Sequence, residues 1–184
     1  MKVRLARRDD LPALVAINTW AIENTTTNFA HAAEPLSQWQ ASYDETHRTL
    51  PWFVADDQAS IVGFAKASPW KSRSAYQYAC EISVYVHHEH HRRGIGRALY
   101  RQLLGTLTRQ GYHTAYGGIV QPNEASVRLH ESLGMKRVAL FPRVGWKFGA
   151  WHDIGYWQAR LRDDGPPVAI RAVLDVVDDE GVSG

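Results

Sequence analysis

The chain has little cysteine and no long apolar segment. Cys80 is its only cysteine, so no disulfide can form within the chain, and we expect a protein of a reducing compartment. No apolar run approaches the roughly 20 residues that a membrane-spanning helix needs, and the N-terminus lacks the apolar core of a signal peptide. These absences predict a cytoplasmic protein without a membrane segment.

Neither positive nor negative residues are in large excess. The formal net charge is only +2, which argues against nucleic acid or a membrane surface as a partner. Positive charge is nevertheless concentrated at one place, in Arg92, Arg93, Arg97 and Arg101. This concentration favours a small anionic ligand.

Internal repeats and low-complexity segments are absent as well. A chain of 184 residues can bury a sizeable core as one globular domain, which we assign to residues 1–162. Residues 163–184 are rich in proline, glycine and acidic side chains. This composition is typical of a flexible C-terminal tail.

A strand, a basic loop and a helix follow one another near the middle of the chain. Residues 81–86 alternate as in a strand, and residues 87–93 are mostly histidine and arginine. Apolar residues then recur at helical spacing: Ile95, Leu99, Leu103 and Leu107. The first amides of a helix lack intrahelical partners and lie at the positive end of its dipole. The segment from Arg92 to Gly96 can therefore wrap N–H groups around a phosphate.

Two familiar phosphate loops do not fit this segment. A dinucleotide-binding fingerprint needs glycine at position 99, where the chain has Leu99, and the Gly-Lys-Ser/Thr of a Walker loop is missing. What remains resembles the pyrophosphate loop of the GNAT family of N-acetyltransferases, Gln/Arg-x-x-Gly-x-Gly/Ala between a strand and a helix. Gly94 and Gly96 match this pattern, whereas His91 departs from it at the first position.

Hydrophobic patterning predicts the other elements. Strands are expected at 3–6, 52–55, 61–67, 78–86, 114–120, 138–148 and 151–161. Helices are expected after Asp9 or Asp10, at 35–46, from 95 to near Gly111, and from Asn123 to Leu133. This order resembles the GNAT fold over roughly residues 3–161. The resemblance implies an α/β (α+β) protein with a mixed central sheet and flanking helices.

Four further groups of residues resemble the phosphinothricin and methionine sulfone N-acetyltransferases. They are Ile22, Glu23, Thr26, Asn28 and Phe29; 69–71 with Arg73, Ala75 and Tyr76; Pro122, Asn123 and 126–128; and 151–153 with Gly155 and Trp157. The resemblance implies acetyl transfer from acetyl-CoA to the α-amine of a small amino-acid analogue such as phosphinothricin, methionine sulfoximine or methionine sulfone. It also implies a homodimer, with no metal.

The same resemblance assigns the acetyl-CoA site. The residues expected to bind it are Val84, Tyr85, Val86, His91, Arg92, Arg93, Gly94, Ile95, Gly96, Arg97, Asn123 and Ser126. A backbone amide near Val84 to Val86 would stabilise the oxyanion of the tetrahedral intermediate. Asn123 and Ser126 would hydrogen-bond the pantetheine arm, and capping of the helix that follows is their other interpretation.

Two titratable residues are candidates for the chemistry. An amine must lose its proton before it attacks a thioester, and Glu81, in an otherwise apolar strand, is the candidate base, with a pKa that burial would raise. The resemblance assigns the same role to this position; an exposed or salt-bridged carboxylate is the alternative. His130 stands where the family has a tyrosine that protonates the leaving thiolate. We expect His130 to act as that acid or to line the acceptor pocket, with a structural role as the alternative.

The acceptor is expected to bind beside Glu81. The segment 70–76 joins two strands just before Glu81, so it can overhang the reacting amine. Arg73 suits a carboxylate, which a guanidinium binds through two hydrogen bonds. The expected acceptor-binding residues are Phe29, Trp70, Lys71, Arg73 and Tyr76. A solvated basic turn is the alternative for 70–76, and another small amine is the alternative substrate.

Metal-binding and RNA-binding modules are alternatives of a different class. His87, His88, His90 and His91 lie close together, but a zincin motif beginning at His88 would need histidine where the chain has Arg92. The seven tryptophans are scattered and do not alternate with basic residues, unlike an RNA-binding surface. A phosphate-bearing cofactor explains the basic loop with fewer assumptions.

Overall fold

The computed structural model describes residues 1–58 and 60–177. Seven strands in these ranges form one sheet: β1 (Lys2–Leu5), β2 (Trp52–Asp56), β3 (Ile61–Pro69), β4 (Ala79–Val86), β5 (Thr114–Gln121), β6 (Lys136–Lys147) and β7 (Ala150–Arg160). The helices are α1 (Leu11–Asn24), α2 (Leu36–Thr46), α3 (Ile95–Gln110) and α4 (Glu124–Glu131). Short 3₁₀ turns lie at η1 (Arg8–Asp10), η2 (Ser74–Tyr76), η3 (His88–His90) and η4 (Val173–Asp175). The predicted strands and helices are confirmed, with end shifts of a few residues.

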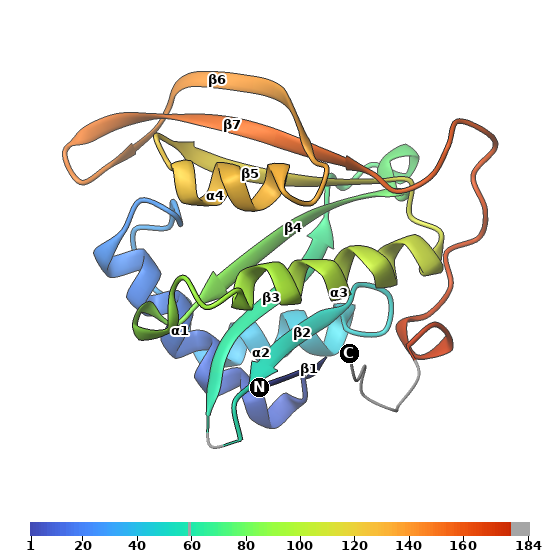
Figure 1. Ribbon diagram of the computed structural model, residues 1–184, viewed down its shortest axis with the longest axis horizontal. Helices are drawn as coiled ribbons and strands as arrows, with labels where there is room; N and C mark the ends of the chain where they lie inside the picture. The colour runs from blue at the N-terminus through green and yellow to red at the C-terminus, as the bar shows by residue number, and fades with distance from the viewer. Residues whose placement is uncertain (59, 178–184) are drawn as a thin grey trace.

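The sheet is mixed, as predicted. Its strand order is β1-β2-β3-β4-β5-β7-β6, and only β4 and β5 run parallel (Figure 1). α1 and α2 pack on one face, where Leu14 and Trp39 meet Val54 and Phe64. α3 packs on the opposite face. Because β2 is covered on both faces, its sequence is continuously apolar instead of alternating.

The predicted apolar stripe of α3 faces the sheet. Leu99, Leu103 and Leu107 are completely buried in the larger core cluster. The helix ends at Gly111, whose φ of 103° lies in the left-handed region that a helix C-terminus commonly uses. The stripe and this terminus fix both the face and the length of α3. Its N-terminus is thereby placed at the carboxyl end of β4.

The parallel strands β4 and β5 diverge soon after they pair. Their ladder covers only residues 79–81 of β4 and 114–116 of β5, although β4 continues to Val86 and β5 to Gln121. α3 begins shortly after the end of β4, and α4 shortly after the end of β5. A gap therefore opens in the sheet between two helix N-termini.

The predicted tail differs from the structure in the part that is described. Val173 is 1% exposed, and its N–H donates a hydrogen bond of 2.8 Å to the Arg48 carbonyl. The Arg171 N–H donates to the Gln110 carbonyl, and the Gln110 side chain donates back to the Arg171 carbonyl. Val173, together with Ile170 and Val177 packed beside the core, and a few hydrogen bonds hold this segment. The prolines and acidic residues on which the tail was predicted do not reveal these contacts. Residues 178–184 of the predicted tail lie outside the described residues.

Candidate active site

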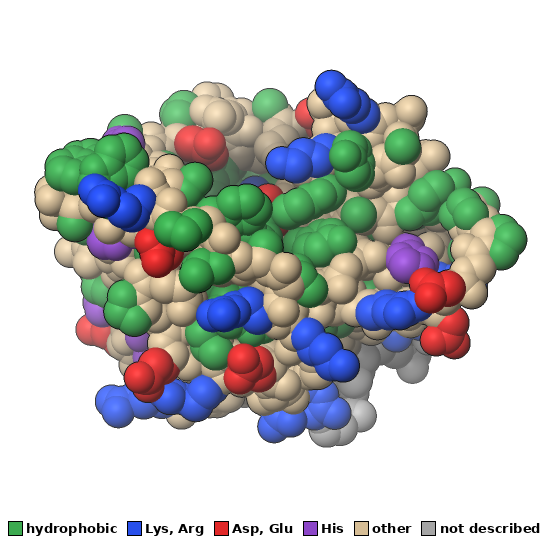
Figure 2. Space-filling view, turned by 90° about the horizontal axis from the view of Figure 1, so that it is seen from above, with side chains coloured by type: hydrophobic (Ala, Val, Ile, Leu, Met, Phe, Trp, Pro, Cys, Tyr) green, Lys and Arg blue, Asp and Glu red, His purple; other side chains and the backbone are tan. Residues whose placement is uncertain are grey.

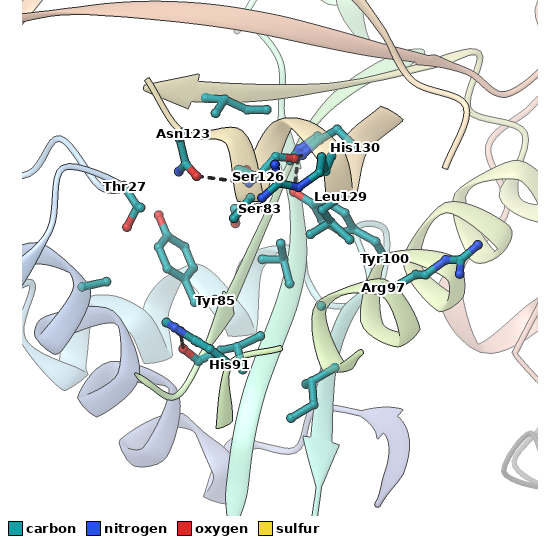
Figure 3. Close-up of a pocket in the computed structure, with 18 of the residues that line it drawn as sticks. Thr27, Ser83, Tyr85, His91, Arg97, Tyr100, Asn123, Ser126, Leu129 and His130 are labelled. Carbon is teal, nitrogen blue, oxygen red and sulfur yellow. Dashed lines mark hydrogen bonds between the residues drawn. The ribbon is translucent and has the colours of Figure 1, made fainter. Parts of the chain in front are cut away.

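A cavity of about 660 Å³ lies where β4 and β5 diverge. Side chains from α1, β4, α3, β5 and α4 line it, together with the loops before α3 and after α1 (Figure 3). The predicted cofactor residues that line it are Val84, Tyr85, Val86, His91, Arg92, Gly94, Ile95, Gly96, Arg97, Asn123 and Ser126. Arg93 is the exception: its guanidinium lies 3.5 Å from His90 Nδ1 on the exposed side of the loop.

The backbone of the loop before α3 is shaped to bind an anion. Arg92 and Gly94 both have left-handed backbone conformations, with φ of 62° and 78°. Such alternation turns successive N–H groups toward one point, and the α3 dipole adds positive potential there. A Cβ at Gly94 would meet no atom within 4 Å, so the backbone is open to a ligand. These features fit the pyrophosphate of acetyl-CoA.

His91 has a structural task that explains its departure from the family pattern. Its Nε2–H donates a hydrogen bond of 3.0 Å to the Val86 carbonyl, the last residue of β4. This bond closes the loop onto the strand that precedes it. The imidazole therefore supports the shape of the loop, while its backbone lies in the cavity wall.

α3 and α4 approach closely across the cavity. A Cβ at Gly96 would lie 3.3 Å from Leu129 Cδ2 and 3.8 Å from Val86 Cγ2. A small residue at this position keeps the passage between the two helices open. On α4, the Asn123 side chain accepts the Ser126 N–H at 3.1 Å, which is the predicted cap (Figure 3). Within the described residues no protein group binds Asn123 Nδ2 or Ser126 Oγ, so both groups are available to a ligand.

His130 is a buried side chain at the inner end of this cavity. It is 3% exposed, and its Nδ1–H donates to the Ser126 carbonyl at 2.8 Å (Figure 3). Nε2 lies 3.4 Å from the Tyr100 hydroxyl, an arrangement in which Nε2 accepts. Burial lowers the pKa of His130, which favours the neutral ring. A neutral ring with its proton on Nδ1 has none to give at Nε2, so this geometry favours lining of the pocket over the acid role.

Glu81 lies on the face of β4 that points away from α3. Cys80 and Ile82 pack against the core under α3, whereas Glu81 and Tyr85 face the α1 side. Burial raises the pKa of Glu81, and the positive charge of Lys71 partly opposes that rise. A half-buried carboxylate of raised pKa is suited to accept a proton near neutral pH.

An open space adjoins the Glu81 carboxylate. Gly118 is exposed although it lies in the central strand β5, and it lines the cavity. Its missing Cβ would lie 3.6 Å from Glu81 Oε1 and 3.3 Å from the Tyr156 ring. The space over Gly118 is therefore bounded by the carboxylate and by an aromatic ring, and it connects with the cofactor cavity.

Aromatic side chains surround this space. The Trp70 ring stacks on Tyr116 at 4.5 Å and meets Tyr156 edge-on at 5.3 Å. Lys71 Nζ lies 5.0 Å from the Trp70 ring centre. The structure thus brings Trp70 and Lys71 to the Glu81 side, as predicted. Sequence reasoning missed Tyr116 and Tyr156. Tyr116 precedes Gly118 by the two-residue period of a strand, which would have indicated it, whereas Tyr156 is brought there by the pairing of β7 with β5, which no local signal shows.

The other predicted acceptor residues lie on the turn before β4 and on the loop after α1. Arg73 and Tyr76 are exposed at the turn η2, and in the described part of the chain no hydrogen bond or ion pair holds the Arg73 guanidinium. Phe29 does not line the cavity. Its ring lies on the backbone of Gly145, where a Cβ would overlap it. The ring therefore anchors its loop, from which Thr25 and Thr27 reach the cavity, and a contact of Phe29 with the acceptor stays a prediction.

Several other residues lining the cavity were not anticipated: Trp20, Ser83, Tyr100 and Leu129. Tyr100 stands one helical turn after Gly96, so helical spacing would have placed it beside the loop. Ser83 follows Glu81 by the two-residue period of a strand. Trp20 and Leu129 come from helices far from the loop in sequence, and nothing local identifies them.

The histidines of the loop stack instead of converging on one point. His88 stacks on Trp20 at 4.3 Å and on His87 at 4.4 Å. In the described ranges no group of three or more His, Cys, Asp or Glu side chains is placed to hold a metal ion. Nor is any helix described here long and apolar enough to cross a membrane.

Comparison with known proteins identifies the family. The acetyltransferase (GNAT) family model matches residues 14–135. The phosphinothricin N-acetyltransferase of Streptomyces viridochromogenes is 36% identical over 176 residues, 96% of either chain. The L-methionine sulfoximine/L-methionine sulfone acetyltransferase of Salmonella typhimurium is 34% identical over 171 residues, 92% of this chain and 99% of that protein. The structure of Salmonella typhimurium YncA with its cofactor acetyl-CoA has a TM-score of 0.87 and 33% identity, covering 91% of this chain and 97% of that chain. The chain therefore belongs to the GNAT family of acetyltransferases.

Proposed function

We propose that this enzyme transfers the acetyl group of acetyl-CoA to the α-amine of a small amino-acid analogue of the phosphinothricin, methionine sulfoximine or methionine sulfone type. The observation that carries the proposal is the Glu81 carboxylate at the open space over Gly118, beside the cofactor cavity. The acceptor class is supported by the names of the two relatives above. Cys80, a free thiol, supports a cytoplasmic location, which we include in the proposal.

Glu81 starts the reaction by accepting a proton. The acceptor reaches the enzyme as an ammonium ion, which has no lone pair for attack. Glu81 takes one proton from it, and the freed amine can then attack. The chemistry that acetyl-CoA supplies when bound is a thioester carbonyl with a thiolate leaving group. The new C–N bond forms and the C–S bond breaks, and the nitrogen then loses its second proton to solvent or to the departing thiolate. The first proton rests on Glu81 until solvent removes it.

The backbone of β4 stabilises the charge that develops. Beyond Glu81, the N–H groups on the β5 side of β4 have no ladder partner, because the strands diverge there. Val84, Tyr85 and Val86 line the cavity there, and a free backbone N–H in this stretch can donate to the oxyanion. A thiolate is a good leaving group, so no acid is required of His130. Its neutral ring instead forms the inner wall.

The acceptor's carboxylate is assigned to Arg73, and this assignment yields a test. Wild type should acetylate methionine sulfone much better than the amine that decarboxylation leaves, because the guanidinium binds a carboxylate through two hydrogen bonds. Arg73→Ala should lose most of this preference, about tenfold or more in kcat/KM, given the roughly 1.5–3 kcal/mol of a charged hydrogen bond. Thiol release from acetyl-CoA measures both rates.

The exposed Arg162 provides a control for the loss of one positive charge. Arg162→Ala should keep the wild-type preference. Equal use of both substrates by wild type would rule out a carboxylate clamp and would favour another small amine as acceptor. A panel of amines in the same assay then identifies that acceptor.

The hairpin of β6 and β7 is the surface that we assign to a homodimer. Its exposed large apolar residues, each at least 42% exposed, are Val138, Leu140, Phe141, Val144, Trp146, Phe148 and Trp151. β6 is also an edge strand, with backbone groups open to pairing. Figure 1 draws this hairpin at the top of the molecule, and Figure 2 views the molecule from that side. Hydrophobic side chains gather on the face that Figure 2 shows. A second copy can cover this surface and continue the sheet.

The molar mass of the protein in solution tests the proposed dimer. Light scattering should give twice the 20.8 kDa of one chain. Replacing both Val138 and Val144 with lysine places charges on the patch and should yield a monomer. Their side chains are about half exposed in one chain, so folding should not depend on them. A wild-type mass of 20.8 kDa at micromolar concentration would overturn the dimer.

A further inference from the structure

Lys147 is an anomaly in β6. It is the only buried residue of this twelve-residue strand, at 3% exposure, and it ends a segment whose other side chains are exposed or half-buried. Lysine is almost never fully buried without a partner. No carboxylate pairs with it in the part of the chain that the structure describes. Burial lowers the pKa of Lys147, as expected for an ammonium group removed from water.

The partners of Lys147 are two backbone carbonyls. Nζ donates hydrogen bonds of 2.6 Å to the carbonyls of Ile22 and Asn28, which lie 125 and 119 positions earlier in the chain. Ile22 is in the last turn of α1, where carbonyls lack helical partners and the dipole is negative. Asn28 is in the loop that follows. One ammonium group therefore holds both ends of residues 22–28, which we call the acceptor loop.

Other contacts fix the same loop. The Phe29 ring lies on Gly145, two residues before Lys147. The Asn28 amide donates to the Tyr85 hydroxyl at 3.2 Å, and Tyr85 shares the Glu81 face of β4. Between these anchors, Thr25 and Thr27 line the cavity. The hairpin end thus determines how the acceptor loop covers the face that carries the base.

We propose that Lys147 is a positioning residue that holds the acceptor loop over the Glu81 face and thereby sets the affinity for the acceptor. The proposal deepens the proposed function and rests on it for the identity of the acceptor. It assigns no contact between Lys147 and either substrate. Its consequence is a separation of effects: the acceptor constant depends strongly on Lys147, whereas the affinity for acetyl-CoA, which the α3 loop binds, depends on it much less.

Lys147→Met tests this separation, because it keeps the aliphatic length and removes the donors. We expect the acceptor KM to rise at least tenfold and the acetyl-CoA dissociation constant, measured by calorimetry without acceptor, to change less than twofold. Lys147→Arg retains a charged donor and should recover part of the loss. Lys136→Met, at the exposed start of the same strand, should behave like wild type. An unchanged acceptor KM, or an equal rise in both constants, would overturn the proposal.

Hydrogen exchange separates this proposal from the substrate assignment. Amides of residues 22–29 should exchange faster in Lys147→Met, while those of α3 should not change, whatever the acceptor proves to be. Unchanged exchange in residues 22–29 would contradict the positioning role even if no amino-acid analogue is acetylated. If Lys147→Met does not fold, Gly145→Ala provides the second variant, since its Cβ displaces Phe29 from the hairpin. It should give the same separation of constants and the same exchange pattern, and its failure to do so would count equally against the proposal.

Discussion

Glu81→Gln should lower kcat by about 10²- to 10⁴-fold, the usual range for loss of a general base. Glutamine keeps the shape of the side chain but cannot accept the ammonium proton. The open space over Gly118 stays the same size, because the amide occupies the position of the carboxylate. The loss should therefore fall on the chemical step, and acetyl-CoA affinity should barely change.

The pH dependence gives a second, independent signature of this base. Glu81 works only when ionised, so kcat/KM should fall as pH decreases through its pKa. Burial raises that pKa, so the fall should occur at higher pH than for a carboxylate in water. In Glu81→Gln this acid limb should disappear.

Glu45, an exposed carboxylate on α2, provides the matched control. Glu45→Gln removes the same charge far from the cavity and should leave both kcat and the acid limb as in wild type. Turnover of Glu81→Gln close to wild type across the pH range would mean that another group, or bulk water, is the base.

The strand, loop and helix around Glu81 could be read from the sequence because their signals are local. The two-residue period of β4, the four-residue stripe of α3 and the left-handed glycines at 94 and 111 each act within a few positions. Most of the cofactor cavity follows from them. The divergence of β4 and β5 was not predictable in this way, because it depends on how β5 pairs with β7.

Contacts between distant segments could not be predicted from the sequence. The Phe29 ring, for example, lies on Gly145 of the hairpin. Lys147 had no distinguishing feature, because the carbonyls that hold it lie more than a hundred residues away. Val173 follows a proline pair in the predicted tail, and only the tertiary structure shows that it is buried. Periodicity carries no information on such pairs.

Gly96→Val should raise the dissociation constant of acetyl-CoA at least tenfold. A Cβ at this position already lies 3.3 Å from Leu129, so the added methyl groups must occupy the passage between α3 and α4 or push α4 away. Tenfold corresponds to about 1.4 kcal/mol of binding free energy. Gly94→Val, which the glycine motif also suggests, is a less specific test of acetyl-CoA binding. Its φ of 78° makes a β-branched residue strained even though the surrounding space is empty.

Gly105→Val is the control for the effect that a valine has on the stability of α3 itself. Gly105 lies in the same helix outside the cavity, and a Cβ there would meet only the end of the Arg109 side chain, at 3.5 Å. Gly105→Val should bind acetyl-CoA like wild type. Titration calorimetry measures both variants, with thermal unfolding as the check that each is folded. Wild-type affinity in folded Gly96→Val would mean that the cofactor does not pass between α3 and α4, and the assignment of the cavity to acetyl-CoA would fail with it.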